Sequence, residues 1–230
     1  MRIGQALANC MKNYIDDDTI LQGYCEPFCG MLSVYKHIPD LFANQEIIYK
    51  AGDANESVIR MWEEAQNGWI PPLNCTENEY LELKDAKPSG AKGFIGHQCG
   101  FGGIYFGGFI GRYGKSTNIT KASDRVCKIA SMLESVKFST GDYTQFSDLK
   151  GYLIYCDPPY SGTQCRYKRR FDADKFHHWC LEMSKYNLVF VSGYTTPNPV
   201  AEAVFQSSYA RHNTHGHITT GSEHLFVYPR

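Results

Sequence analysis

The chain has 230 residues, of which 43% are hydrophobic, and this is enough for one sizeable core with a small inserted subdomain. No run of about 18 apolar residues is present and the N-terminus carries no signal-peptide pattern, so we expect a cytoplasmic protein without a membrane span. Nine scattered cysteines predict reduced thiols, and we expect no metal site. The formal net charge of −1 argues against a uniformly basic nucleic-acid-binding surface.

Charge is nevertheless uneven along the chain. Residues 1–83 hold five Lys and Arg against thirteen Asp and Glu, whereas residues 84–128 hold eight against two. A second basic cluster lies at 166–170. Such a distribution can bind phosphates locally while the whole protein stays near neutral. A set of solvated basic faces is the alternative interpretation.

Predicted helices and strands alternate along the chain. Helices are expected at about 3–14, 30–41, 55–66, 76–84, 121–134 and 174–184, and strands at 21–25, 46–51, 136–139, 152–156, 187–192 and near 225–228. This alternation predicts an α/β fold with a doubly wound, mostly parallel sheet and a small loop-rich or helical insertion. We assign 1–70 and 135–230 to the catalytic domain and 71–134 to the insertion. Ligands should bind at the carboxyl ends of the strands.

The first such strand end reads Glu26-Pro27-Phe28-Cys29-Gly30. Gly30 allows a tight turn and a close approach of the backbone to a ligand. The helix expected at 30–41 would place free N–H groups and a positive dipole end there, which suits an anionic group of a small cofactor. Taken alone, a glycine after a strand is most often only a turn.

Residues 90–114 alternate glycines with aromatic residues. Regular helices and strands avoid so much glycine, and a low-complexity linker would not carry so many aromatic side chains. We therefore expect an ordered, loop-rich insertion that approaches a ligand closely. Polar residues at its end are candidates for contacts with phosphates or base edges: Arg112, Lys115, Ser116 and Asn118.

The strongest motif is Asp157-Pro158-Pro159-Tyr160, directly after the predicted strand 152–156. Each residue has a role if a planar amino group is to be methylated. The Asp157 carboxylate accepts one N–H, the Pro158 carbonyl accepts the other, and Tyr160 offers a flat face for a nucleobase. The plain alternative is a strand that ends in a Pro-Pro turn with a capping Asp.

Taken together and in this order, the motifs at 26–30 and 157–160 resemble those of the S-adenosylmethionine-dependent DNA adenine-N6 methyltransferases of the α group, which includes the GATC-methylating enzymes and their phage, viral and bacterial members. That family has a second glycine where Leu32 stands and usually a Glu where Gly193 stands. It also begins with a basic loop of which Met1-Arg2-Ile3-Gly4 resembles only the tail. The departures at Leu32 and the N-terminus affect the cofactor side of the site.

The resemblance implies site-specific methylation of an adenine that has left the DNA helix, with double-stranded DNA as partner and a monomer or weak dimer as the active form. Asp53 would bind the cofactor ribose and also cap the following helix. Asp142 would contact the cofactor adenine, and the Tyr143 side chain would line the adenine pocket. The full cofactor set is Glu26, Pro27, Phe28, Gly30, Asp53, Asp142, Tyr143 and Asp157; the catalytic set is Asp157, Pro158, Pro159 and Tyr160; and the DNA-binding set is Arg112, Lys115, Ser116, Asn118, Arg166, Tyr167, Lys168, Arg169 and Arg170.

Three other functions stay open at this point. A glutamine methyltransferase uses a similar pocket but typically has Asn where Asp157 stands. An RNA adenine-N6 methyltransferase would use the same motifs. A catalytically impaired DNA-binding module is the third, given Leu32 and the N-terminus. A companion restriction enzyme is a further expectation that comes from the resemblance alone.

Overall fold

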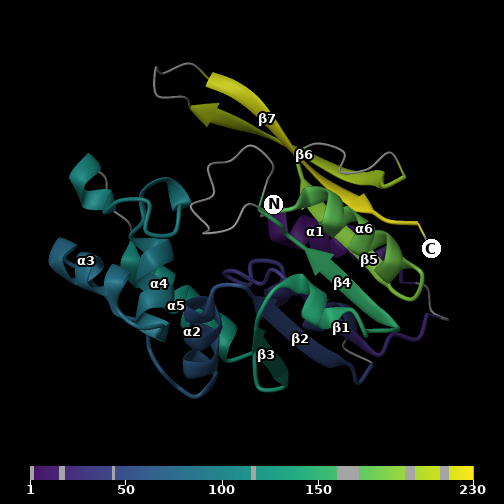
Figure 1. Cartoon of the computed structure of the whole chain (residues 1–230), viewed down its shortest axis with the longest axis horizontal. Helices are drawn as coiled ribbons and strands as arrows, with labels where there is room; N and C mark the ends of the chain where they lie inside the picture. Colours follow the sequence, from purple (N-terminus) through teal and green to yellow (C-terminus); the bar gives the residue numbers. More distant parts are fainter. Residues whose placement is uncertain are drawn as a thin grey trace. The chain divides into compact units, whose positions relative to one another are not determined.

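A computed structural model describes residues 3–15, 19–42, 45–114, 118–159, 171–194, 200–212 and 218–229 (Figure 1). The chain divides into two compact units. The first takes residues 1–29, 33–51 and 143–230, and the second takes 30–32 and 52–142. The predicted insertion 71–134 lies wholly within the second unit, together with residues 52–70.

The described strands form one seven-stranded sheet in the order β3-β2-β1-β4-β5-β7-β6. Strand β1 pairs in parallel with β2 and β4, β4 pairs in parallel with β5, and β7 runs antiparallel to both β5 and β6. The strands are β1 (Gly23–Glu26), β2 (Ile48–Asp53), β3 (Val136–Thr140), β4 (Tyr152–Cys156), β5 (Leu188–Gly193), β6 (Glu202–His212) and β7 (Ile218–Val227). This mixed, mostly parallel α/β sheet confirms the predicted fold class.

In the first unit, helix α6 (Ala173–Ser184) covers one face of the sheet (Figure 1). Its Phe176 and Cys180 pack into one core with Ile154 and Cys156 of β4. Side chains alternate across a strand, so Leu153 and Tyr155 point to the opposite face. Helix α1 (Ile3–Lys12) belongs to that face, because Tyr14 just beyond it meets the ring of Phe190 edge-on at 5.4 Å.

The helix expected at 30–41 is absent from this described stretch, and that prediction is wrong. Two short 3-10 helices, Tyr35–His37 and Pro39–Phe42, take its place. Gly30 and Leu32 both have positive φ, 43° and 49°, and an α-helix cannot pass through left-handed residues. No helix dipole is therefore available to favour an anion at Gly30.

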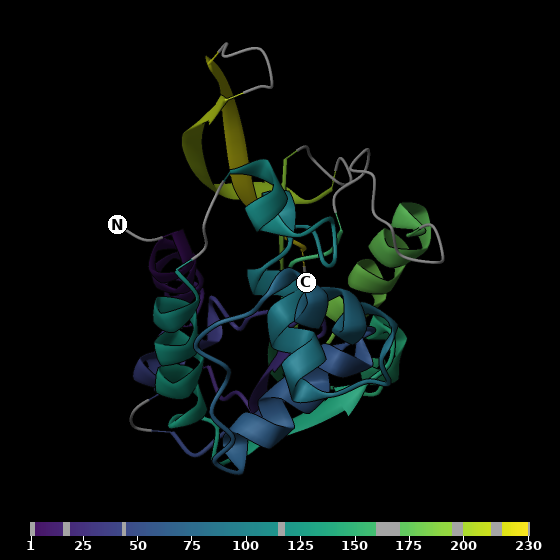
Figure 2. The same cartoon turned by 90° about the vertical axis from the view of Figure 1, so that its left-hand side faces the viewer.

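In the second unit, α2 (Glu56–Gln66) packs against α4 (Gly90–Gln98), and Figure 2 shows the helices of this unit in blue and teal. The prediction of a loop-rich stretch at 90–114 missed α4. A Cβ on Gly93 would lie 2.1 Å from the Ser57 carbonyl oxygen, so glycine lets the two helices approach closely. The remaining elements of the unit are α3 (Glu77–Asp85), α5 (Ile119–Ala130) and the 3-10 helices Phe101–Gly103 and Ile110–Tyr113.

No helix in the described ranges combines the length and the apolar character that crossing a bilayer requires.

Candidate active site

Asp157 directly follows β4, at the carboxyl end of a strand that lies inside the sheet. Its side chain is exposed, whereas Pro158 behind it is buried. The hydroxyl of Ser192, at the end of β5, donates to Asp157 Oδ1 at 2.8 Å. One carboxylate oxygen is thus held by the protein. The structure therefore places Asp157, Pro158 and Pro159 at the predicted edge of the sheet, while Tyr160 lies outside the described residues.

Glu26 ends β1 on the same edge of the first unit and is only 2% exposed. The Tyr24 hydroxyl donates to Glu26 Oε1 at 2.7 Å. Burial raises the pKa of Glu26 to about 8, although the hydrogen bond from Tyr24 lowers it, and the nearby charge of Asp157 raises it further. Glu26 is therefore largely protonated at neutral pH, so a predicted cofactor residue is neutral beside a predicted catalytic carboxylate.

Aromatic rings collect next to Pro27, again within the first unit. Phe28 is only partly buried, and its ring centre lies 5.7 Å from that of Tyr143 and 5.4 Å from that of Phe176. Phe171 joins the same group at 6.0 Å from Phe28. Two of the predicted cofactor residues, Phe28 and Tyr143, are therefore in contact and form an apolar wall.

In the second unit, Asp53 at the end of β2 holds the turn at Gly30. Asp53 Oδ2 accepts from the backbone N–H of Gly30 at 3.1 Å, and Oδ1 accepts from the N–H of Asn55 at 2.8 Å. Trp62 Nε1 donates to the Gly30 carbonyl at 2.8 Å. Burial raises the pKa of Asp53, opposed by its two backbone donors. These bonds bring the predicted residues Gly30 and Asp53 together.

The helix cap expected at Asp53 belongs to a different residue. Asn55 is the N-cap of α2, because its side chain accepts from the N–H of Ser57 at 3.1 Å. The Asp53 side chain therefore caps no helix and instead holds the Gly30 turn. Asp142, two residues after β3, is exposed, and the N–H of its neighbour Gly141 donates to the Asp53 carbonyl at 3.0 Å.

Two of the predicted DNA-binding residues, Arg112 and Asn118, lie within the described ranges. The Arg112 guanidinium pairs with the Glu77 carboxylate in the first turn of α3, and both side chains are largely exposed. Asn118 is the N-cap of α5, since its Oδ1 accepts from the N–H of Lys121 at 2.9 Å. The other members of the set lie outside the described residues: Lys115, Ser116, Arg166, Tyr167, Lys168, Arg169 and Arg170.

Sequence reasoning missed several residues of the site. The predicted site sets contain neither Ser192, at the end of the expected strand 187–192, nor Trp62, in the expected helix 55–66. Tyr105 was seen only as part of the glycine-rich stretch. Its hydroxyl interacts with the Ser57 and Asn55 side chains, and its ring lies 4.9 Å from that of His97. The one available signal was spacing, because Ser192 comes at the end of an apolar strand.

A model of the D12 class N6 adenine-specific DNA methyltransferases matches residues 104–187. The matched segment contains the Asp157-Pro158-Pro159-Tyr160 motif at the carboxyl end of β4. Over this segment the chain is similar to the D12 class. The matched family acts on the N6 amino group of adenine in DNA and depends on S-adenosylmethionine. No curated protein matches the chain in sequence.

Several solved structures of methyltransferases resemble the chain in fold. The rRNA methyltransferase aviRa of Streptomyces viridochromogenes is 12% identical with a TM-score of 0.41, over 97% of this chain and 84% of that one. TrmN of Thermus thermophilus is 11% identical with a TM-score of 0.41, over 97% and 48%. Precorrin-6y C5,15-methyltransferase of Geobacter metallireducens is 11% identical with a TM-score of 0.39, over 98% and 87%. At these identities the likeness concerns the fold alone.

The residues present fit the D12 cofactor. Each Asp53 oxygen accepts one backbone bond and keeps acceptor capacity for a ribose hydroxyl. A Cβ added at Gly30 would have no atom within 4 Å, so the backbone there faces open space. The Phe28 and Tyr143 rings offer apolar faces for a purine. The acceptor oxygens of Asp53 and the apolar rings of Phe28 and Tyr143 are each chemically compatible with a part of S-adenosylmethionine.

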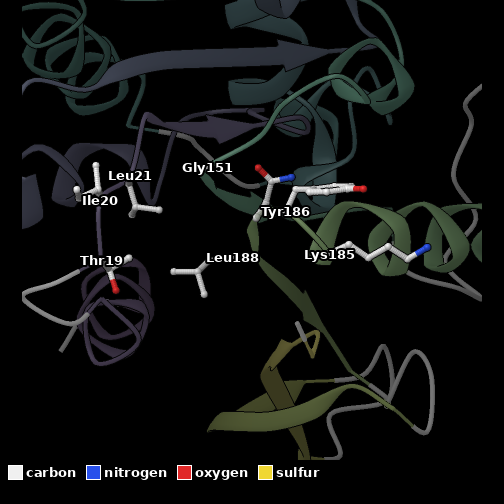
Figure 3. Close-up of a pocket in the computed structure, with 8 residues that line it drawn as sticks. Thr19, Ile20, Leu21, Gly151, Lys185, Tyr186 and Leu188 are labelled. Atoms are coloured by element: carbon white, nitrogen blue, oxygen red, sulfur yellow. The ribbon is translucent and has the colours of Figure 1, made fainter.

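A pocket of about 400 Å³ lies elsewhere in the first unit (Figure 3). It is lined by Leu21, Gly151, Tyr186 and Leu188 among others, and these residues precede or begin strands β1, β4 and β5. The pocket therefore opens at the amino ends of the strands, opposite the edge that carries Asp157. It is no part of the candidate site at the carboxyl ends of the strands.

Proposed function

We propose that the protein transfers a methyl group from S-adenosylmethionine to the N6 amino group of an adenine at a particular sequence of double-stranded DNA, after the adenine has left the helix. The observation that carries the proposal is Asp157 at the end of β4, exposed to a substrate and held through one oxygen by Ser192 at 2.8 Å. A carboxylate fixed in this way can accept a hydrogen bond from an amino group in a defined direction.

In this mechanism the Asp157 carboxylate accepts one amino N–H and the Pro158 carbonyl accepts the other. Pro158 has no N–H and a restricted φ, which keeps that carbonyl in place. The two bonds draw the nitrogen toward tetrahedral geometry, so its lone pair points away from the ring. The cofactor supplies the electrophilic methyl group for in-line attack. Removing the base from the stack costs a few kcal/mol, which stacking on Tyr160 and phosphate contacts would offset.

The predicted cofactor residues keep the roles that the resemblance gives them. In the second unit, Asp53 would accept from the ribose hydroxyls, Asp142 would contact the adenine amino group, and Gly30 would lie against the methionine end. In the first unit, Phe28 and Tyr143 would stack on the adenine, next to Pro27. Protonated Glu26 is neutral and so would not repel the cofactor's carboxylate.

DNA contacts are proposed for the 71–134 segment and for 166–170. Arg112 and Lys115 in the first, and Arg166, Lys168, Arg169 and Arg170 in the second, would neutralise phosphates. Ser116, Asn118 and Tyr167 carry neutral side chains that suit base edges or bases. Asn118 keeps its amide N–H donors for this task, because the helix cap uses only Oδ1.

The test is transfer of tritium from labelled S-adenosylmethionine to unmethylated genomic DNA, with RNA of matched length in parallel and Asp157→Ala as the inactive control. We expect label in DNA, released as N6-methyladenine, and mapped positions that share a short sequence. Label in RNA alone would establish the RNA methyltransferase instead. Cofactor binding without transfer to either would contradict an active enzyme.

The impaired DNA-binding module is disfavoured by the conformation of the turn. Leu32 has a φ of 49° and is fully buried, so the leucine occupies a left-handed backbone conformation that glycine adopts readily. Calorimetry with S-adenosylmethionine separates the two functions, since a module without activity has no need to bind it.

A further inference from the structure

The turn at Gly30 is held from both sides by side chains of the second unit. The N–H of Gly30 belongs to the peptide plane before this residue and donates to Asp53 Oδ2 at 3.1 Å. The Gly30 carbonyl belongs to the plane after it and accepts from Trp62 Nε1 at 2.8 Å. Two fixed peptide planes define φ and ψ of the residue between them. Asp53 and Trp62 therefore hold Gly30 together in its left-handed conformation, which has a φ of 43°.

The two contacts to Gly30 differ in what else their side chains do. Asp53 is the proposed acceptor for the cofactor ribose, so its bond to Gly30 would share a carboxylate with the cofactor. Trp62 is fully buried in α2, and an indole carries a single N–H that can only donate. That proton is used at the Gly30 carbonyl. The Trp62 bond therefore holds the turn without competing with the cofactor for the same group.

A turn with two left-handed residues needs such support. Leu32 has a φ of 49°, a conformation that costs energy for a residue with a Cβ and persists where the surroundings fix it. The support comes from a rigid element, because Asn55 caps α2 and Trp62 lies roughly two helical turns further on. The position of the indole is thus set by the helix and not by the turn itself.

We propose that Trp62 is a positioning residue for the cofactor, whose indole N–H keeps the Gly30 turn in its binding shape before S-adenosylmethionine arrives. The inference rests on the proposed function and deepens it. A preformed turn raises affinity, because the cost of ordering it is met in folding and not in binding. Without the indole donor, the peptide plane after Gly30 can rotate, and the turn has to be ordered at each binding event.

A purely structural role for Trp62 is the competing explanation, since a buried indole N–H generally needs an acceptor. The two roles differ in what a variant changes. Loss of a structural hydrogen bond lowers the melting temperature, and the folded protein still binds cofactor with wild-type affinity. Loss of a positioning hydrogen bond weakens cofactor binding by protein that is fully folded. Replacement by phenylalanine also removes buried volume, so the decisive variant changes the N–H alone.

The experiment replaces Trp62 by benzothienylalanine, which keeps the shape of the ring and has sulfur where the indole has its N–H. Ile59→Val is the matched control, because it removes one buried methyl group from α2 and no hydrogen bond. Calorimetric titration well below the melting temperature should show about 3- to 10-fold weaker S-adenosylmethionine binding for the benzothienylalanine variant. Ile59→Val should change the dissociation constant less than about 2-fold, since it leaves the turn bonded. Trp62→Phe should weaken binding at least as much as the benzothienylalanine variant.

The inference is overturned if the benzothienylalanine variant binds S-adenosylmethionine with wild-type affinity, or if Ile59→Val loses as much affinity. If wild-type protein binds no S-adenosylmethionine, the proposed function fails separately. Crystal structures of wild type and the benzothienylalanine variant then decide whether Trp62 sets the turn. That role predicts a Gly30 carbonyl that is rotated or disordered in the variant and ordered in wild type. An unchanged turn refutes it.

Discussion

The backbone N–H of Gly30 donates to Asp53 Oδ2 at 3.1 Å, which joins two segments 23 residues apart in sequence. The other oxygen of Asp53 accepts from Asn55. The carboxylate that we propose as the ribose acceptor therefore also fixes the turn expected to hold the methionine end of the cofactor. In this proposal, cofactor binding and the shape of the Gly30 turn would depend on the same side chain.

Replacing Asp53 by Ala should weaken S-adenosylmethionine binding by about 1–3 kcal/mol, because charged hydrogen-bond partners are left unmet. Asp53→Asn keeps one acceptor oxygen, so its affinity for S-adenosylmethionine should lie between those of Asp53→Ala and wild type. Calorimetric titration measures both. A wild-type dissociation constant for Asp53→Ala would limit Asp53 to holding the turn.

Replacing Asp157 by Ala should abolish methyl transfer and leave the fold intact, since the side chain is exposed and removes no packing. Cofactor affinity should fall only modestly. Tritium transfer to DNA measures the first effect, and circular dichroism with cofactor titration measures the second. Near-native turnover of this variant would mean that another group orients the amino nitrogen.

Glu26 makes stability depend on pH. Its pKa is about 8 in the folded protein against an ordinary value of 4.5. Between these values the folded state binds a proton that the unfolded state has released, so the free energy of unfolding falls as pH rises, by up to about 1.4 kcal/mol per unit. Urea unfolding at several pH values in this window measures the slope.

Glu26→Gln is the matched control for this effect, because it keeps an acceptor for the Tyr24 hydroxyl and cannot ionise. We expect the slope to become shallower in Glu26→Gln by the amount that Glu26 contributes. An equal slope in wild type and variant would show that Glu26 keeps its ordinary pKa in the folded protein.

Arg112→Ala should weaken DNA binding nearly equally on all sequences and make the slope of log affinity against log salt shallower by about one unit. Glu77→Gln offers the opposite control, since it releases Arg112 from its ion pair and should strengthen binding. The pair is exposed, so neither change should alter stability much. Fluorescence anisotropy across a salt series measures the DNA affinity of wild type, Arg112→Ala and Glu77→Gln. Equal affinity in Arg112→Ala and Glu77→Gln would place DNA on another surface.

Gly93→Ala should destabilise the protein by about 1–3 kcal/mol, because the new methyl group would lie against the Ser57 carbonyl of α2 and backbone cannot easily move. Gly90→Ala in the same helix is the matched control. There the nearest atom is the movable end of the Glu64 side chain, so the cost should be smaller. Denaturant unfolding measures the free energy of unfolding of both variants. An equal loss in Gly93→Ala and Gly90→Ala would contradict close packing of α2 and α4.

Local patterns in the sequence were enough for most elements. The apolar run at 152–156 is the strand β4, and the predicted helix at 174–184 differs from α6 by one residue. The predictions failed where long-range contacts override local preference. Helix α4 forms despite its glycines because close contact with α2 compensates for their low helix propensity. The 30–41 stretch avoids a helix because its turn is held from Asp53 and Trp62.

The sequence by itself determined the chemistry of the protein: Asp157-Pro158-Pro159 after a buried strand, and a carboxylate at the end of β2, were readable because each depends on residues adjacent in the chain. Only the tertiary structure decided which other side chains form hydrogen bonds with these groups. Ser192 meets Asp157 because β4 and β5 pair in parallel in one register, and a shift of one residue would turn Ser192 to the other face. Register is a property of the whole sheet, and no local pattern contains it.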